Sequence, residues 1–337
     1  MAIMKIHRGA ARGFAAAALG AAVMAGAFMP ASAAEQFWVY LRGSDPRPQG
    51  SWDVTLQDIV RTGKAGGDYT SHDVRVSSEY GITNKLTLRG TIAFSNHDYA
   101  IDDPALQPYY STQGGEGGRV SRTDFAGYEV GTTYNLMSNY GDEPFGLSVG
   151  AGVGKYRRAR LDGAPVEQDE VKLDAVAQKN FFDNTLVFAV NPQLTLEKRR
   201  FRPGDASSLG ADAREEEVSL AVSAGASYRF AKGWFAGLEY RHQSDFFTPS
   251  RGGALATEGN AGLWPSDADL LPEFGDRFHN GDYLGPTLHY GSAKWWATAG
   301  ALFQVNGGGA DGAFGSGGRN YSGNEDVHAS VAVGFNF

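Results

Sequence analysis

The last eleven residues, 327–337, alternate without exception between an apolar side chain and a small or polar one. Because successive side chains of a β-strand point to opposite faces, this segment has one apolar face and one mixed face. The apolar face carries Val327, Ala329, Val331, Val333, Phe335 and Phe337. Such an edge strand would template aggregation in an open sheet, whereas a closed barrel has no edge. The pattern therefore predicts a membrane-spanning β-barrel that turns this face to lipid.

The same eleven residues resemble the carboxy-terminal recognition strand of bacterial outer-membrane β-barrels. The resemblance implies that Phe335 and Phe337 form the insertion signal and that the barrel-assembly machinery is a partner. It also implies a place in the bacterial cell outer membrane, in contact with its lipids and lipopolysaccharide.

The first 33 residues have the three parts of a secretory signal peptide. Lys5, Arg8 and Arg12 make the start positive, residues 14–29 carry no charge, and the small-residue segment 30–33 follows. We expect residues 1–33 to be cleaved. The alternative, a membrane anchor, is less favoured because the apolar run is near the lower length limit for a span. The chain has no Cys, which excludes disulfides and thiolate chemistry.

From residue 51 onward the sequence alternates with a period of two, interrupted in turn by short and long breaks. The expected strands are 51–62, 69–82, 85–97, 122–137, 144–157, 167–181, 185–199, 215–230, 234–247, 281–290, 295–306 and 327–337. The prediction is an all-β fold: a transmembrane, antiparallel, up-and-down barrel of about twelve strands, formed by residues 51–337. The short breaks become periplasmic turns, the long breaks become extracellular loops, and segment 327–337 pairs with segment 51–62. A soluble β-sandwich would not need such long strands.

Aromatic residues near the periplasmic turns are expected to form an interfacial girdle. They are Tyr134, Tyr140, Phe145, Phe181, Phe182, Phe230, Trp234, Trp295, Trp296 and Phe337. The mean hydropathy of −0.33 agrees with a barrel, which hides its apolar residues by alternation. With a formal net charge of −8, a nucleic-acid partner is not expected.

The inward faces of the expected strands carry charges of both signs, which pair across neighbouring strands. The predicted lumen-lining residues are Asp73, Arg75, Glu79, Arg89, Glu129, Lys172, Asp174, Glu197, Arg199, Glu239, Arg241 and Asp245. Strands 144–157 and 215–230 have nearly bare inner faces of Gly, Ala and Ser, which leave room for water, a solute or a plug. We expect a narrow, polar, partly obstructed pore with no cofactor and no metal.

Residues 34–50 precede the barrel and contain Phe37, Trp38 and Tyr40, which are too apolar to float free in the periplasm. Pro46 and Pro48 interrupt any strand there. The hypothesis is that this lead segment tucks into the periplasmic mouth or the lumen and narrows it. The alternatives are a first short strand or a disordered lead.

Several stretches resemble an uncharacterised family of proteobacterial outer-membrane barrels of unknown function. That family is loosely similar to the meta-pathway (aromatic degradation) transporter-like barrels. The stretches are 35–38, 79–86, 234–239 and 284–291, the last followed by Trp295 and Trp296. The hairpin at 79–86 recurs in many barrels and specifies a turn more than a family. The resemblance implies, at most, passive passage of small solutes.

One motif points to a different class of function. His242 and Ser244 form a His-x-Ser pair, which alternation places on the lipid-facing side near the extracellular rim. The pair resembles the His-x-Ser of outer-membrane phospholipase A and lipid A deacylase, which use a Ser nucleophile and a His base. A third group must orient the imidazole, and Asn280 or Asp282 is the candidate. Asp245 follows where those families usually place Asn, and no Gly stands beside the pair for an oxyanion hole.

The function predicted from the sequence is a narrow outer-membrane pore or transporter-like channel for small solutes, not an enzyme. A lipid hydrolase using His242 and Ser244 is one alternative. A structural or surface-interaction barrel without transport is another.

Overall fold

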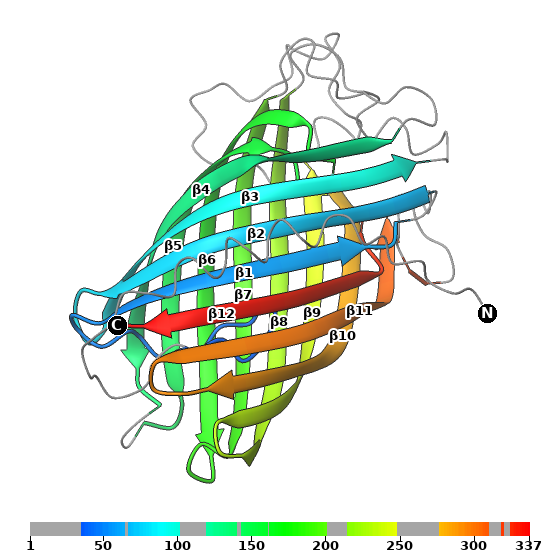
Figure 1. Ribbon diagram of the computed structural model, residues 1–337. Coiled ribbons are helices and arrows are strands. Elements are labelled where there is room, and N and C mark those ends of the chain that lie inside the picture. The colour runs from blue at the N-terminus through cyan, green and yellow to red at the C-terminus, as the bar shows by residue number, and fades with distance from the viewer. Residues whose placement is uncertain are drawn as a thin grey trace.

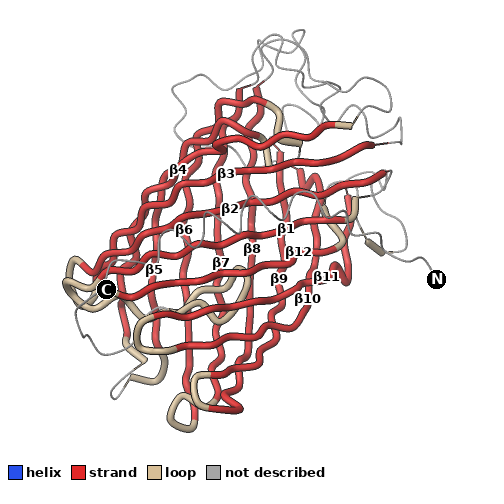
Figure 2. The backbone as a smooth tube through the Cα atoms, in the orientation of Figure 1, coloured by secondary structure: helices blue, strands red, loops and turns tan. Residues whose placement is uncertain are grey.

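The computed structural model describes residues 35–64, 67–101, 119–139, 143–160, 162–200, 214–247, 276–309, 318–319 and 324–337. These residues form a single closed antiparallel barrel of twelve strands, strongly tilted in Figure 1 and drawn as a tube in Figure 2. The described part of the chain contains no helix long and apolar enough to cross a membrane.

The strands follow one another around the barrel in chain order. They are β1 (Trp52–Thr62), β2 (Gly67–Gly81), β3 (Leu86–Ile101), β4 (Val120–Met137), β5 (Gly146–Arg158), β6 (Pro165–Phe181), β7 (Leu186–Arg200), β8 (Arg214–Ala231), β9 (Trp234–Phe247), β10 (Asp276–Gly291), β11 (Trp295–Gly309) and β12 (Val327–Asn336). The predicted fold class and the number of strands are confirmed.

The barrel closes between its first and last strands. β1 pairs with β12 from Asp53 opposite Asn336 to Thr62 opposite Val327, as the terminal alternation predicted. On β12, Val331 is 58% exposed on the outer face, whereas His328 is 4% exposed and points inward. The period-two pattern therefore separates lipid-facing from lumen-facing residues.

Tight turns join the strands at the periplasmic end. Between β6 and β7, the three consecutive residues Phe182, Asp183 and Asn184 have positive φ angles of 51°, 52° and 61°. Asp and Asn tolerate this left-handed region better than most residues do. Between β8 and β9, Gly233 has φ 76°, and a Cβ there would lie 2.6 Å from the carbonyl oxygen of Gly291. A glycine is therefore required at this turn.

Two expectations need correction. β10 begins at Asp276, five residues before the predicted start, because residues 276–280 are mostly polar and lack the alternation that lipid imposes. Backbone pairing with β9 nevertheless continues as far as Asp276 opposite Phe247.

Trp296 is not part of the girdle: it is 1% exposed and faces inward, since its neighbour Trp295 faces lipid at 41%. Tyr140 lies outside the described residues.

Candidate functional site

The interior wall holds the charged residues that the alternation pointed to. Ten of the twelve predicted lumen residues line one internal cavity: Asp73, Arg75, Glu79, Arg89, Glu129, Lys172, Asp174, Glu197, Arg199 and Arg241. The other two, Glu239 and Asp245, are fully buried and contact other groups. Glu239 accepts hydrogen bonds from the backbone of residues 39–41, which precede the barrel. Asp245 accepts from Ser219 and Gln243 on the wall.

Residues 35–50, here called the inner segment, start and end at the periplasmic side of the barrel. At the start, a carboxylate oxygen of Glu35 lies 3.0 Å from His289 Nε2 at the end of β10. At the end, the Gln49 N–H donates to Asn84 in the β2–β3 turn at 2.9 Å. Between these points the segment passes through the lumen.

The middle of the inner segment is bound by a single carboxylate. Glu239 on β9 accepts the backbone N–H groups of Val39 at 2.6 Å, Tyr40 at 3.0 Å and Leu41 at 3.0 Å. Successive backbone N–H groups directed at one anion form a concave binding site. Glu239 is therefore the polar anchor of the segment.

Apolar contacts hold the same stretch from both sides. Trp38 and Leu41 pack with Val187 and Ala189 of β7 in one buried cluster. On the opposite side, Val39 packs with Tyr283 and Leu302.

The bare inner face of β8 makes room for this packing. A Cβ at Gly225 would lie 2.5 Å from Trp38 Nε1, so a larger residue at this point collides with the indole. The bare inner face of β5 has a similar role, because Ser148 Oγ donates to the Ser44 carbonyl oxygen.

The inner segment fills only one side of the lumen. Its apolar residues contact β7 through β11, whereas the cavity is walled mainly by β1 through β7. The cavity has a volume of about 270 Å³ and also contacts Tyr40, Arg42 and Arg47 of the inner segment. A polar space therefore remains beside the inner segment.

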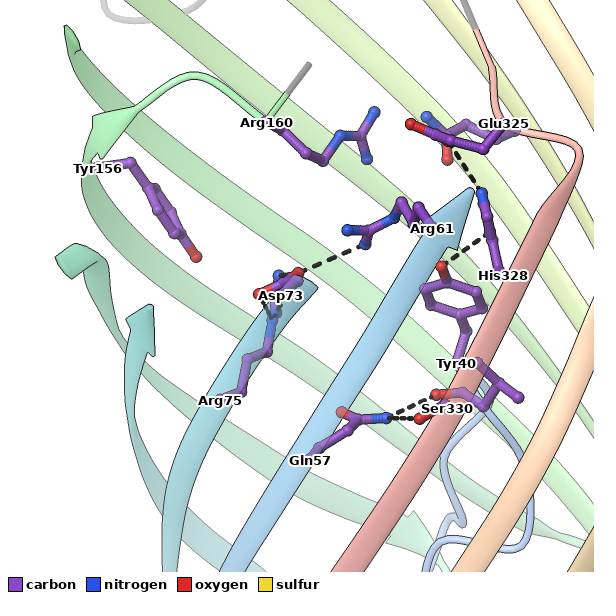
Figure 3. A network of polar contacts seen from close by, with 12 residues as sticks. Tyr40, Gln57, Arg61, Asp73, Arg75, Tyr156, Arg160, Glu325, His328 and Ser330 are labelled. Atoms are coloured by element: carbon purple, nitrogen blue, oxygen red, sulfur yellow. Dashed lines mark hydrogen bonds and ion pairs between the residues drawn. The ribbon is translucent and has the colours of Figure 1, made fainter. Parts of the chain in front are cut away.

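Polar contacts line the lumen side of the neighbouring strands β2, β1 and β12 toward the extracellular end, as Figure 3 shows. Arg61 and Arg75 lie 3.4 Å and 3.0 Å from the same oxygen of Asp73. His328 on β12 contacts the inner segment through Tyr40 Oη at 2.9 Å, and it contacts Glu325, just before β12, at 3.0 Å. Two cations thus share one carboxylate on the cavity side.

Two guanidinium groups in this region form no ion pair with a described carboxylate. Arg241 lies 4.3 Å above the Tyr40 ring and bonds to Ser223 and Gln243. Arg160, from the segment between β5 and β6, projects toward Arg61 and Glu325 in Figure 3. These two cations contribute positive potential to the wall, which nearby acids such as Glu239 and Glu325 offset in part.

Glu325 precedes β12 and lies outside the spanning strands. Burial alone would raise the pKa of its carboxyl, but Lys64 at 3.1 Å and the hydrogen bond with His328 hold that pKa well below its usual range. The Lys64 ammonium is buried as well, and burial lowers its pKa despite the attraction of Glu325. The ionised pair ties the end of β1 to the start of β12.

Alternation would have found Arg61, since it shares the inner face of β1 with Gln57 and Ile59. Arg160 and Glu325 lie in connecting segments without periodicity, so no sequence signal pointed to them. Within the described ranges, no three His, Asp or Glu side chains are grouped as a metal site requires.

The outer wall brings the His-x-Ser pair together with an acid. His242 Nε2 lies 2.8 Å from Ser244 Oγ, and His242 Nδ1 lies 2.7 Å from Asp282 Oδ1. Of the two candidates for the third group, Asp282 is the one that contacts the imidazole. Asn280 stands opposite Ser244 in the β9–β10 register instead.

Solved structures of similar fold are outer-membrane barrels. The COG4313 outer membrane channel from Pseudomonas putida F1 aligns with a TM-score of 0.56 and 12% identity, over 87% of this chain and 98% of that one. The NanC porin aligns with a TM-score of 0.41 and 8% identity, over 84% and 98%. The KdgM porin in complex with disordered oligogalacturonate aligns at 0.37 and 9%, over 85% and 99%. The last two scores are too low to support an argument.

No curated protein matches the sequence. A family model described as a family of unknown function (DUF6662) matches residues 30–337, so the chain belongs to that family. The predicted relationship to an uncharacterised barrel family is confirmed, and the protein is an outer-membrane β-barrel.

Proposed function

We propose that this member of the DUF6662 family is a narrow pore for small polar solutes, and that its path is the cavity beside the inner segment. The observation that carries the proposal is the unfilled, charged space of about 270 Å³ between the inner segment and β1 through β7. Pockets for drug-sized ligands measure about 300–1,000 Å³, so this space suits smaller solutes.

The charges on the wall support a preference for anions. Arg61 and Arg75 share the single carboxylate of Asp73, and Arg160 and Arg241 form no ion pair with any described acid. Rings of cationic side chains favour anions in other pores. The preference is modest, because Glu129, Glu197 and other acids face the same cavity.

The inner segment limits the flow through the pore. Each hydrogen bond contributes roughly 0.5–1.5 kcal/mol, and Glu239 makes three of them to the segment. Glu239→Ala removes the polar anchor while it leaves the β-sheet pairing intact. The segment then leaves the lumen more often and the pore widens.

Single-channel recordings of the folded full chain in planar lipid bilayers test the proposal. We expect small, steady conductance steps for the chain itself and steps several-fold larger for Glu239→Ala. Asp245→Ala is the matched control, because Asp245 is also a fully buried inward carboxylate but accepts from Ser219 and Gln243 on the wall and does not line the cavity. Absence of channel steps from both the chain and Glu239→Ala would contradict the pore and favour a structural barrel.

The proposal also covers the export of the chain and the insertion of the barrel into the outer membrane. Cleavage after residue 33 leaves Glu35 free to enter the barrel with the inner segment. Phe335 and Phe337, which are 36% and 52% exposed on the outer wall, are available to the assembly machinery. We expect Phe337→Ala to lower the amount of folded barrel in isolated outer membranes, while the same chain refolds normally in detergent. Equal amounts in the membrane would contradict the insertion signal.

A further inference from the structure

A chain of three side chains on the lipid-facing wall has the arrangement of a hydrolytic triad. Ser244 and His242 lie two residues apart on β9, and Asp282 faces His242 across the β9–β10 pairing. The distances are 2.8 Å from the hydroxyl to the imidazole and 2.7 Å from the imidazole to the carboxylate. We propose that this wall carries an esterase site for the acyl esters of outer-leaflet lipids, in addition to the pore.

The hydrogen bonds select the useful tautomer of the imidazole. An ionised carboxylate only accepts, so His242 Nδ1 carries the proton that is shared with Asp282. In the neutral imidazole, His242 Nε2 then carries no proton and accepts the Ser244 Oγ–H. A serine hydroxyl is a weak nucleophile until an adjacent base takes its proton. His242 is therefore in the state that a general base requires.

Asp282 is itself held by neighbours on two other strands. Tyr240 Oη donates to Oδ1 at 2.7 Å, and Asn306 Nδ2 donates to Oδ2 at 2.7 Å. These bonds orient the carboxylate before any substrate arrives, and they keep it from turning away from His242. A supporting shell of this kind is a requirement for a catalytic constellation. Asp282 is a positioning residue, because it acts through the imidazole.

The height of the site fits a lipid ester. His242 lies eight residues after Trp234, the first residue of β9, which corresponds to roughly 20 Å along the membrane normal for a strand tilted by about 40°. The apolar band of such a barrel is about 25 Å tall, so the triad lies near the outer interface. Ester groups lie at this interface, with their acyl chains in the apolar band.

The wall below the triad offers a surface for an acyl chain. Its exposed apolar side chains are Leu238, Tyr240, Leu284, Leu288, Phe303 and Val305. Ser244 is only 4% exposed, whereas the His242 side chain is 32% exposed. The open approach to the pair is therefore over the imidazole.

A donor for the oxyanion stands in register with the nucleophile. The backbone N–H groups of a barrel strand are engaged in sheet pairing, so a side chain must supply the donor. Asn280, which lies opposite Ser244 and pairs with Gly308 on β11, is the candidate for this donor. A Cβ at Gly308 would lie 3.3 Å from Asn280 Oδ1.

The reaction is hydrolysis of a carboxylic ester by water. Ser244 Oγ attacks the ester carbonyl carbon and its proton moves to His242 Nε2. The carbon–oxygen bond to the alcohol then breaks, and His242 returns the proton to the departing alcohol. Water attacks the resulting acyl-serine with the same base, which releases the fatty acid and restores Ser244. No oxidant or reductant is involved.

A second imidazole–carboxylate pair on the same wall provides a matched control. His72 Nδ1 lies 2.9 Å from Asp58 Oδ2, and alternation along β1 and β2 turns both side chains to lipid. In the described residues, the hydrogen bonds of His72 include no serine hydroxyl. His72→Asn therefore removes a similar pair without touching the nucleophile.

Two measurements on the folded full chain test the site. The first is fatty-acid release, by mass spectrometry, from vesicles of phosphatidylethanolamine and phosphatidylglycerol and, separately, from lipopolysaccharide. The second is covalent labelling by a long-chain alkyl fluorophosphonate, located by peptide mass. We expect labelling of Ser244 and release from one of the two lipids, which identifies the source of the ester. Ser244→Ala should abolish labelling and lower release by at least a factor of about 1,000.

The variants separate a positioning role from a structural one. Asp282→Asn should slow labelling of Ser244, and Asp282→Glu should recover part of that loss, while His72→Asn keeps the unmodified rate. Channel conductance should be the same in Ser244→Ala as in the chain itself. A negative result for the esterase therefore leaves the pore proposal standing, and the reverse also holds. No release from either lipid together with no labelling of the folded chain overturns the proposal. Equal release by Ser244→Ala overturns it as well.

Discussion

On each face of β9 a carboxylate accepts three hydrogen bonds, but the two carboxylates hold different groups in place. On the inner face, Glu239 collects three backbone N–H groups and holds the inner segment in the lumen. On the outer face, Asp282 on the adjacent strand collects three side-chain donors and holds the imidazole of His242. In both places a carboxylate with three hydrogen bonds fixes another group. The difference is what it fixes: a blocking segment inside, and a base beside a hydroxyl outside.

The comparison shows that one strand presents an anchor for the inner segment on its lumen face and a hydrogen-bonded His–Ser pair on its lipid face. Successive residues of β9 point to opposite sides, so Arg241 faces the cavity while His242 faces lipid. A change on one face leaves the side chains of the other in place. Variants that affect only one face therefore test whether the two faces of β9 act independently.

Loss of the buried indole should have the largest effect. Trp38 is 0% exposed, and replacing a buried aromatic residue by Ala costs about 3–5 kcal/mol. In Trp38→Ala, we expect faster hydrogen exchange at the N–H groups of Val39, Tyr40 and Leu41, together with larger conductance steps. Fluorophosphonate labelling at Ser244 should not change. A variant with altered labelling but unaltered exchange would show that the two faces are coupled.

Filling the bare inner face should have a smaller effect. In Gly225→Val, the new side chain meets Trp38, and overpacking of this kind costs about 1–3 kcal/mol. We expect the inner segment to shift and the conductance to rise less than in Trp38→Ala. Gly90→Val is the matched control, because a Cβ at Gly90 on β3 meets no atom within 4 Å. Equal effects of the two variants would contradict the packing role of Gly225.

Low pH should weaken the contacts of Glu325 with Lys64 and His328 at the extracellular end of the lumen. The folded-state pKa of Glu325 lies well below the ordinary value of 4.5, so its contribution to stability is fully present above pH 4.5. That contribution is lost as the pH falls from 4.5 through the folded pKa. We expect the noise of the open channel to increase as the pH falls below 4.5. Glu325→Gln should remove this pH dependence, and a dependence that persists in that variant would exclude Glu325 as its source.

Neutralising one lumen cation should have the smallest effect. Arg241 forms no ion pair with a described acid, so Arg241→Gln removes a charge without freeing a carboxylate partner. We expect the anion-to-cation permeability ratio, measured from reversal potentials in a salt gradient, to fall about twofold. His242→Asn, on the outer face of the same strand, should leave the ratio unchanged. A ratio that does not move in Arg241→Gln would contradict the proposed selectivity.

Much of the barrel was accessible from the sequence because lipid imposes a period of two on every spanning strand. The strand from Trp234 to Phe247 was placed with its bounds as found, and the partner of the last strand was identified. The start of β10 was placed too late in the sequence, because residues 276–280 are mostly polar and carry no alternation. The inward position of Trp296 was missed because two adjacent tryptophans both suggested the interface.

Alternation is a local property of an extended chain, so it is enough to assign the lipid-facing and lumen-facing residues of the strands. Which of these side chains contact one another depends on how the strands pair in three dimensions. The β9–β10 pairing runs without a shift from Tyr290 opposite Trp234 to His279 opposite Asp245, and this register places Asp282 rather than Asn280 opposite His242. The contact of Glu239 with residues 39–41 spans about 200 positions and follows from the path of a segment without periodicity. Such contacts depend on the closed barrel, because closure brings distant strands around one shared interior.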